Sequence, residues 1–245
     1  MDEDLQKWRE RPLGEVKYLI LDARYEKVRH GGSVRDGAVL TAIGVDAEGR
    51  RSVLGVSVSL SEAEIHWREF FKSLLARGLH GVELITSDAQ AGLAEARKAC
   101  FTGVPWQRCR FHLMQNALAH VPREEMKREV IDDLRSVLDS ADEHRAAEQL
   151  ARVARKYEKT APKLSAWMDQ NVHESFAVFR LPPAHRVRLR TTNMLERVHR
   201  ELKRRTRVAT LFPNEASLLR LVTAVLMEVS EEWETGKRYV TFETK

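Results

Sequence analysis

Two acidic residues each close a run of apolar residues. Asp22 ends VKYLILD and Asp88 ends VELITSD, and both runs are typical of buried β-strands. An unpaired carboxylate in such a place is costly to desolvate, so a neutralising partner is expected. Mg²⁺ prefers carboxylate oxygens, and two ions about 3.5–4 Å apart activate an attacking oxygen and stabilise a leaving one. Alternatively, one acid caps the following turn and the other pairs with an arginine.

Glu196 is the third candidate ligand, in the segment TTNMLERVHRELKRRTR. Asn193 as N-cap with Glu196 three residues later also fits a capping box, which requires no metal. On a helix, Glu196 shares a side with Arg200, Lys203 and Arg207, and a carboxylate among phosphate-binding bases suits a nuclease-like site. The alternative is a solvated basic face. The crowded bases are Arg197, Arg200, Lys203, Arg204, Arg205 and Arg207.

The elements around these acids predict an α/β fold with mixed strand directions. GAVLTAIGVDAEGRRSVLGVSVSL predicts two strands that flank a turn at 46–49. Ser61 and Glu64 fit a capping box that opens a helix ending near Gly78. The apolar side of that helix is expected to include Ile65, Phe70, Leu74 and Leu75. AQAGLAEARKA predicts a further helix, and VPWQRCR a weaker fifth strand.

After about Phe111 the pattern changes to helices. Apolar residues recur at helical spacing from Arg123 to about Lys159, before the break at Leu181-Pro182-Pro183. A last helix is expected from Glu215 to about Trp233.

The composition indicates a globular protein of a reducing compartment. The 245 residues are 43% hydrophobic, enough for a sizeable core, and two cysteines are too few for a disulfide framework. The net charge of +5 only mildly favours a polyanionic partner. The first residues lack the order of a signal peptide, and no run of about 18 apolar residues occurs. Secretion and membrane spanning are disfavoured.

Six blocks occur in an order that resembles bacterial insertion-sequence transposases of the Mutator-like family, from about Leu13 to the end. They are LDARYEKVR, GVSVSLSEAEIHW, RGLHGVELITSDAQAGL, PWQRCRFHLMQN, TTNMLERVHRELKRRTRV and FPNEASLLRLV. The resemblance implies a ribonuclease-H-like mixed sheet with flanking helices and an Asp-Asp-Glu triad of Asp22, Asp88 and Glu196. It places a first core part at residues 1–110, an all-helical insertion at 111–184, and the final helices at 185–245.

The activity that the resemblance implies is Mg²⁺-dependent cleavage of DNA ends followed by strand transfer. The triad would hold two Mg²⁺ ions, for which Mn²⁺ can substitute, while Arg200, Lys203, Arg204 and Arg207 hold the DNA backbone. Expected partners are transposon ends, target DNA and further copies of the chain, as a dimer or larger assembly. The expected location is the bacterial cytoplasm, at the nucleoid during activity.

Three further residues gain roles from the resemblance. His112 is expected near the scissile phosphate with Cys109 packed beneath it, and Trp167 could stack on an unpaired base. The alternatives are a buried Cys with a satisfied core His, and a plain core Trp. Two ligands alone do not make a zinc site.

The sequence shows no candidate helix-turn-helix before Asp22, whereas the family carries an end-recognising region there. A catalytically silent DNA-binding or oligomerising regulator is therefore one alternative function. A nuclease on the same fold is the other, because a fold does not fix a function.

Overall fold

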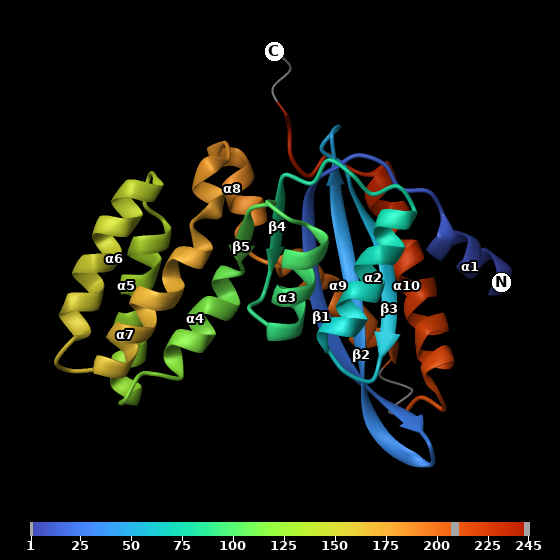
Figure 1. Ribbon diagram of the computed structural model, residues 1–245, viewed down its shortest axis with the longest axis horizontal. Coiled ribbons are helices and arrows are strands. Elements are labelled where there is room, and N and C mark those ends of the chain that lie inside the picture. The colour runs from blue at the N-terminus through green and yellow to red at the C-terminus, as the bar shows by residue number, and fades with distance from the viewer. Residues whose placement is uncertain (1, 207–210, 243–245) are drawn as a thin grey trace. The chain divides into compact units, whose positions relative to one another are not determined.

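The computed structural model describes residues 2–206 and 211–242 (Figure 1). The chain divides into two compact units. The first comprises Met1–Ile85, Ala89–Pro105 and Thr192–Lys245, and the second comprises Thr86–Asp88 and Trp106–Thr191. Residues 111–184, the expected helical insertion, lie within the second unit, which begins earlier and ends later.

The described residues form a five-stranded sheet in the order β3-β2-β1-β4-β5. The strands are β1 (Val16–His30), β2 (Ser33–Asp46), β3 (Arg51–Ser59), β4 (Leu84–Ser87) and β5 (Trp106–Arg108). β1, β2 and β3 pair antiparallel, whereas the bridge between Glu15 and His80 is parallel. The expected mixed α/β fold, the turn at 46–49 and the weak fifth strand are confirmed.

β1 and β2 continue as a two-stranded ribbon beyond the end of β3 (Figure 1). β3 pairs with β2 only from Ala38 onward, but the pairing of β1 with β2 continues to His30 and Ser33. Gly31 and Gly32 have φ angles of 54° and 79°, and this conformation at both central residues makes a tight hairpin turn. Asp22 therefore ends the continuous buried run of β1, not the strand itself, and Val28 is buried further along.

The first unit holds five helices among the described residues. They are α1 (Asp2–Glu10), α2 (Glu64–Ala76), α3 (Ala91–Cys100), α9 (Asn193–Thr206) and α10 (Glu215–Thr235). Four of them contact β1 or β3, while α3 packs on α2. α2 and α10 contact β3, and α9 contacts β1. This brings the helix that carries Glu196 onto the strand that carries Asp22.

The start of α2 differs from the sequence prediction. Its N-cap is Ala63, without a side-chain cap, so the expected Ser61 capping box is wrong. The buried stripe is Trp67, Phe70, Phe71 and Leu74, whereas Ile65 and Leu75 are 56% and 38% exposed. Because the helix begins at Glu64, this stripe has the i, i+3, i+4, i+7 spacing of one helix face. The predicted end is confirmed, since Gly78 follows with φ of 90°.

The second unit is helical apart from its strand segments. Its helices are α4 (Arg110–Leu118), α5 (Lys127–Leu138), α6 (Glu143–Tyr157), α7 (Pro162–Asn171) and α8 (Pro183–Leu189), with 3-10 turns at Glu124–Met126, Val172–Ser175 and Ala177–Arg180. One apolar core runs through it, from Leu113 to Phe179. The predicted run of helices is confirmed. None of the helices described for this chain is long and apolar enough to cross a membrane.

Candidate active site

Asp22 is a nearly buried carboxylate in the first unit, 8% exposed. Its Oδ1 accepts a hydrogen bond from the Ala23 backbone N–H at 3.0 Å. Thr41 lies directly opposite on β2, and its Oγ1 is buried without a hydrogen-bond partner among the described residues. Residues opposite each other in an antiparallel pair point to the same face, so a carboxylate and an unsatisfied hydroxyl share this face.

The side chain of His199 on α9 lies close to the Asp22 carboxylate. Its Nδ1 lies 3.6 Å from Asp22 Oδ2, within ion-pair range. Burial, followed by the charge of Arg24, lowers the pKa of His199 to about 4. The imidazole is therefore neutral at pH 7, and Coulomb attraction does not hold the pair together. Arg24 also donates to the His199 backbone carbonyl at 2.9 Å, which fastens α9 to β1.

Glu196 lies one turn before His199 on α9. Its backbone N–H bonds to the Thr192 carbonyl at 3.1 Å, which makes Thr192 the N-cap and Glu196 the fourth helical residue. A capping box requires Glu at the third position, so the predicted Asn193 cap is wrong by one residue. In the described structure Glu196 Oε1 is buried and accepts no hydrogen bond. A capping box therefore does not explain the presence of Glu196 at this position.

Asp88 is half-buried and follows β4 directly, in the short segment Thr86–Asp88 of the second unit. Thr86 Oγ1 donates to the Leu189 carbonyl at 2.8 Å, and the Cys109 N–H donates to the Ser87 carbonyl at 2.7 Å. Ser87 Oγ accepts from Trp106 Nε1 at 2.9 Å and donates to the Asp88 carbonyl at 2.8 Å. The backbone before Asp88 is therefore fixed on both sides.

Cys109 and His112 lie at the start of α4. Cys109 is fully buried and is the N-cap residue of that helix, and this burial agrees equally with packing beneath His112 and with a plain buried Cys. His112 is half-buried, and its ring centroid lies 5.4 Å from that of Phe111. The position of His112 relative to a scissile phosphate stays a prediction.

Trp167 packs against the core of the second unit. Its ring stacks on His120 with centroids 5.4 Å apart, and the Arg108 guanidinium lies 5.5 Å from its centroid. These contacts favour the alternative of a core Trp over that of a base-stacking platform.

The basic residues of α9 differ in how far acids neutralise them. Arg204 and Arg205 both bond to Glu201 and lower its pKa to about 2, and Arg205 also pairs with Glu228. Arg200 and Lys203 are exposed, and neither makes an ion pair in the part of the chain that the structure describes. Arg207 lies outside the described residues. Among the described residues of α9, Arg197, Arg200 and Lys203 are thus exposed bases without an ion pair, and Arg200 and Lys203 share a side with Glu196.

The side-chain atoms on the elements around Asp22 are of the kinds that bind a divalent metal ion. The residue opposite Asp22 and the helix packed on its strand supply Thr41 Oγ1, Glu196 Oε1 and His199 Nε2, which are buried atoms without hydrogen-bond partners in the described chain. Such atoms call for an ion or water, and carboxylate and hydroxyl oxygens suit Mg²⁺. Across residues 2–206 and 211–242, no three His, Cys, Asp or Glu side chains are already gathered to hold a metal. The donor chemistry fits Mg²⁺, while a complete ligand set is not preassembled.

His199 and Thr41 were missed by sequence reasoning. A helical turn separates His199 from Glu196, so the spacing i, i+3 alone could have placed both on one side. No comparable signal marks Thr41, because its place beside Asp22 depends on the strand register.

The amino-acid sequence matches a known family along nearly the whole chain. Residues 1–236 match the model of the family described as Transposase, Mutator family. The chain therefore belongs to the Mutator family of transposases.

Named relatives agree with this assignment. The chain is 54% identical to the transposase for insertion sequence element IS406 of Burkholderia multivorans, over 99% of this chain and 62% of that protein. It is 42% identical to the transposase for ISRM5 of Rhizobium meliloti, over 99% and 61%, and 38% identical to that for IS1081 of Mycobacterium tuberculosis, over 99% and 59%. The chain thus spans about three fifths of the length of these curated relatives.

One solved structure is also similar, at 16% identity and a TM-score of 0.23, over 64% of this chain and 49% of that chain. It is described as the cryoEM structure of a simian T-cell lymphotropic virus intasome in complex with PP2A regulatory subunit B56 gamma. A TM-score this low supports no argument about a shared fold.

Proposed function

We propose that this chain is the catalytic region of a DNA transposase that cleaves DNA ends and joins them to target DNA, on a ribonuclease-H-like fold. The observation that carries the proposal is that the strand and the helix packed against β1 carry buried atoms without hydrogen-bond partners among the described residues, in a chain of the transposase family. These atoms are Thr41 Oγ1 on β2 and Glu196 Oε1 and His199 Nε2 on α9. A purely structural acid would have its donors and acceptors satisfied. A site that takes up cations and phosphate would not.

Asp22, Asp88 and Glu196 are the proposed ligands of two Mg²⁺ ions. Bound there, Mg²⁺ supplies charge for activation of the attacking oxygen and stabilisation of the leaving one. The chain's own residues do the positioning. His199, neutral and buried, limits the conformations open to the Asp22 carboxylate, and Arg24 holds α9 against β1 through the His199 carbonyl.

The proposed reaction has two displacements at phosphorus. In the first, a water oxygen bonds to a DNA phosphorus while the bond from phosphorus to the 3′ oxygen breaks, leaving a 3′-OH and a 5′-phosphate. In the second, that 3′ oxygen attacks a phosphorus of target DNA and expels another 3′ oxygen. The attacking water and hydroxyl each lose a proton to solvent, and each departing 3′ oxygen takes up a proton from solvent. The proposed substrates are transposon ends and target DNA, handled by a dimer or larger assembly in the bacterial cytoplasm at the nucleoid.

Metal uptake without DNA tests the site directly. Mg²⁺ or Mn²⁺ at about 100 times its dissociation constant should stabilise the native chain by roughly 2.7 kcal/mol. For a chain of this size that raises the melting temperature by about 5–10 °C. Thermal melts with Mg²⁺, Mn²⁺ and chelator measure the shift. Saturable stabilisation is expected, and melting temperatures that are the same with ions and with chelator contradict the metal assignment.

The exposed bases of α9 give a second expected result. Replacing Arg200 and Lys203 with Ala should weaken duplex DNA binding whatever the sequence. It should also flatten the dependence of log affinity on log salt by roughly 1 per lost phosphate contact, because each contact releases counterions. The matched control replaces Lys72 and Arg220, exposed bases on α2 and α10, with Ala. Equal slopes in the two double variants mean that the α9 bases are merely solvated.

A further inference from the structure

Three arginines of the second unit gather near one carboxylate. Arg110 Nη1 and Arg190 Nη1 both donate to the same Asp139 oxygen, at 2.9 Å and 2.8 Å. Arg186 lies close by, but its recorded hydrogen bonds go to the backbone carbonyls of Leu181 and Ala141, at 2.8 Å and 2.7 Å. Asp139 therefore pairs with two of the three guanidinium groups, and Arg186 adds a third positive charge nearby.

The arrangement carries excess positive charge where solvent screens it poorly. Arg110 is only 6% exposed, and burial, with Arg190 and Arg186 as like charges, lowers its pKa to about 10. Asp139 is the acid that opposes these charges in the described chain. Crowded guanidinium groups in a poorly solvated place are unfavourable until an anion joins them.

The three side chains are held in place before any ligand arrives. The guanidinium carbons of Arg110 and Arg186 lie 5.9 Å and 5.7 Å from the ring centroid of Phe179, which is buried. The Arg110 backbone N–H donates to the Arg190 carbonyl at 3.0 Å, and Arg110 Nε is buried without a partner in the described structure. Arg186 and Arg190 remain partly exposed. A ligand could thus reach two prepositioned guanidinium groups.

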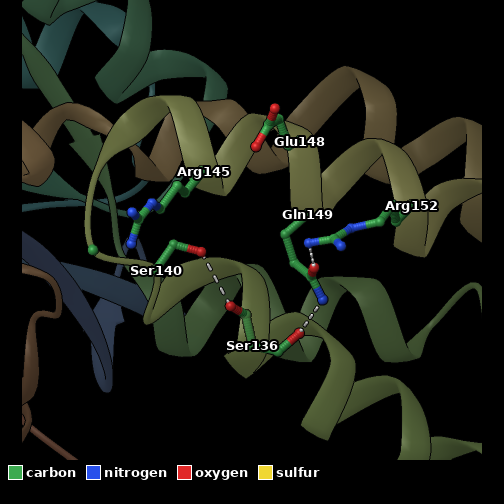
Figure 2. Close-up of a pocket in the computed structure, with 7 residues that line it drawn as sticks. Ser136, Ser140, Arg145, Glu148, Gln149 and Arg152 are labelled. Carbon is green, nitrogen blue, oxygen red and sulfur yellow. Dashed lines mark hydrogen bonds between the residues drawn. The ribbon is translucent and has the colours of Figure 1, made fainter.

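The nearby pocket between α5 and α6 provides a contrast (Figure 2). This cavity of about 350 Å³ is lined by Arg145 and Arg152, but Glu148 lies beside them. Arg152 donates to Gln149, and Arg145 lies 3.7 Å from Asp142. The arginines of the pocket are matched by acids and amides, so the pocket has no excess charge for an anion.

We infer that Arg186 and Arg190, supported by Arg110, bind a phosphodiester group of the DNA strand on which the chain acts; this inference rests on the proposed function. Guanidinium forks match phosphate oxygens in geometry as well as charge. Asp139 holds the arginines in position and competes with the phosphate. Such a contact fixes the register of the DNA without reading its sequence.

The cluster is connected to the segment that carries Asp88, within the same unit. Cys109, next to Arg110, bonds to the Ser87 carbonyl, and Leu189, next to Arg190, accepts from Thr86. Both connections are short: the first joins two backbone groups, and the second joins the Thr86 hydroxyl to a backbone carbonyl. A phosphate held by the cluster is therefore positioned relative to Asp88 through rigid contacts, as a substrate-orienting site requires.

Duplex DNA binding in the presence of chelator tests the inference. The Arg186→Ala/Arg190→Ala variant should bind a short duplex roughly tenfold more weakly, with a salt slope flatter by about 1 to 2. Arg128→Ala/Arg135→Ala removes the same charge from exposed positions of α5 and should bind like wild type. Equal binding by the wild type and the Arg186/Arg190 variant overturns the inference.

A second variant, which is expected to raise the affinity for DNA, separates loss of the phosphate site from misfolding. Asp139→Asn removes the competing carboxylate from an exposed position, so duplex affinity should rise several-fold, which a misfolded chain cannot mimic. Unchanged or weaker binding by a folded Asp139→Asn chain counts against the phosphate site.

If the cluster variants behave as expected but no metal supports DNA joining, the phosphate site stands and the proposed function fails. If joining occurs but the cluster variants bind like wild type, only this inference fails.

Discussion

Asp88→Asn is expected to abolish DNA cleavage and joining while leaving the fold intact. The substitution keeps the size of the side chain but removes an anionic oxygen from the proposed ligand set. Loss of charge compensation where the transition state needs it should lower the rate at least 10²–10³-fold, the scale of removing one electrostatic stabiliser. The backbone contacts that fix the segment involve Thr86, Ser87 and Cys109, so they should survive the change.

Three measurements make this expectation sharp. Product from a precleaved DNA end should fall to background, metal-induced thermal stabilisation should shrink, and the melting temperature in chelator should match that of wild type. Asp169→Asn, at an exposed position of α7, changes the same charge and should leave all three unaffected. Joining at the wild-type rate by Asp88→Asn would remove Asp88 from the catalytic set.

Glu196→Gln has the second largest expected effect, because this acid has lost its structural explanation. Glu196 is the fourth residue of α9, so it does not complete a capping box, and its Oε1 is buried without a hydrogen bond among the described residues. A neutral amide should cost at most about 0.3–1 kcal/mol through the helix dipole. It should nevertheless cut cleavage and joining on the order of 10²–10³-fold, if a carboxylate is needed there.

The expected pattern is a near-wild-type melting temperature in chelator, little stabilisation by Mg²⁺ or Mn²⁺, and almost no joined product. Glu231→Gln, at an exposed position of α10, is the matched control. If Glu196→Gln joins DNA like wild type, the third ligand lies elsewhere. Should it instead unfold in chelator, the buried carboxylate has a structural role that its contacts do not show.

Local sequence pattern predicted the elements whose signal is periodic and strong. VKYLILD and VELITSD predicted the buried runs of β1 and β4. The acid that closes the first run is nearly buried, and the acid that closes the second is half-buried. The helices of the second unit followed from their 3.6-residue spacing. The face of a strand or helix that is buried against its neighbours needs apolar side chains, so the spacing of apolar residues in the sequence predicts the element.

Boundaries and turns were harder to predict. The Gly-Gly turn at residues 31 and 32 lies in polar sequence, so the apolar pattern gave no reason to extend β1 and β2 to it. Cap residues at Ala63 and Thr192 were each misplaced, because Ser, Thr and Asn near a helix start compete for the same role. Moving the start of α9 by one residue changed the meaning of Glu196.

The polar neighbours of the candidate site depend on tertiary structure. His199 reaches Asp22 only because Arg24 and the packing of α9 bring the helix onto β1. Arg110, Arg186 and Arg190 are separated along the chain, and their shared carboxylate becomes visible only when α4, α5 and α8 are folded together. Neither the net charge nor the local spacing of residues could have predicted this cluster.

The most direct test of the proposed function is the joining of a precleaved DNA end to a supercoiled target by the unmodified chain, with Mg²⁺ and with chelator. An RNA–DNA hybrid is run in parallel. The account predicts Mg²⁺-dependent joined product from DNA and no cleavage of the hybrid. Cleavage of the RNA strand without DNA joining would identify a ribonuclease on the same fold. Stable DNA binding with no joined product under any metal would identify a silent regulator, and either result contradicts a transposase catalytic region.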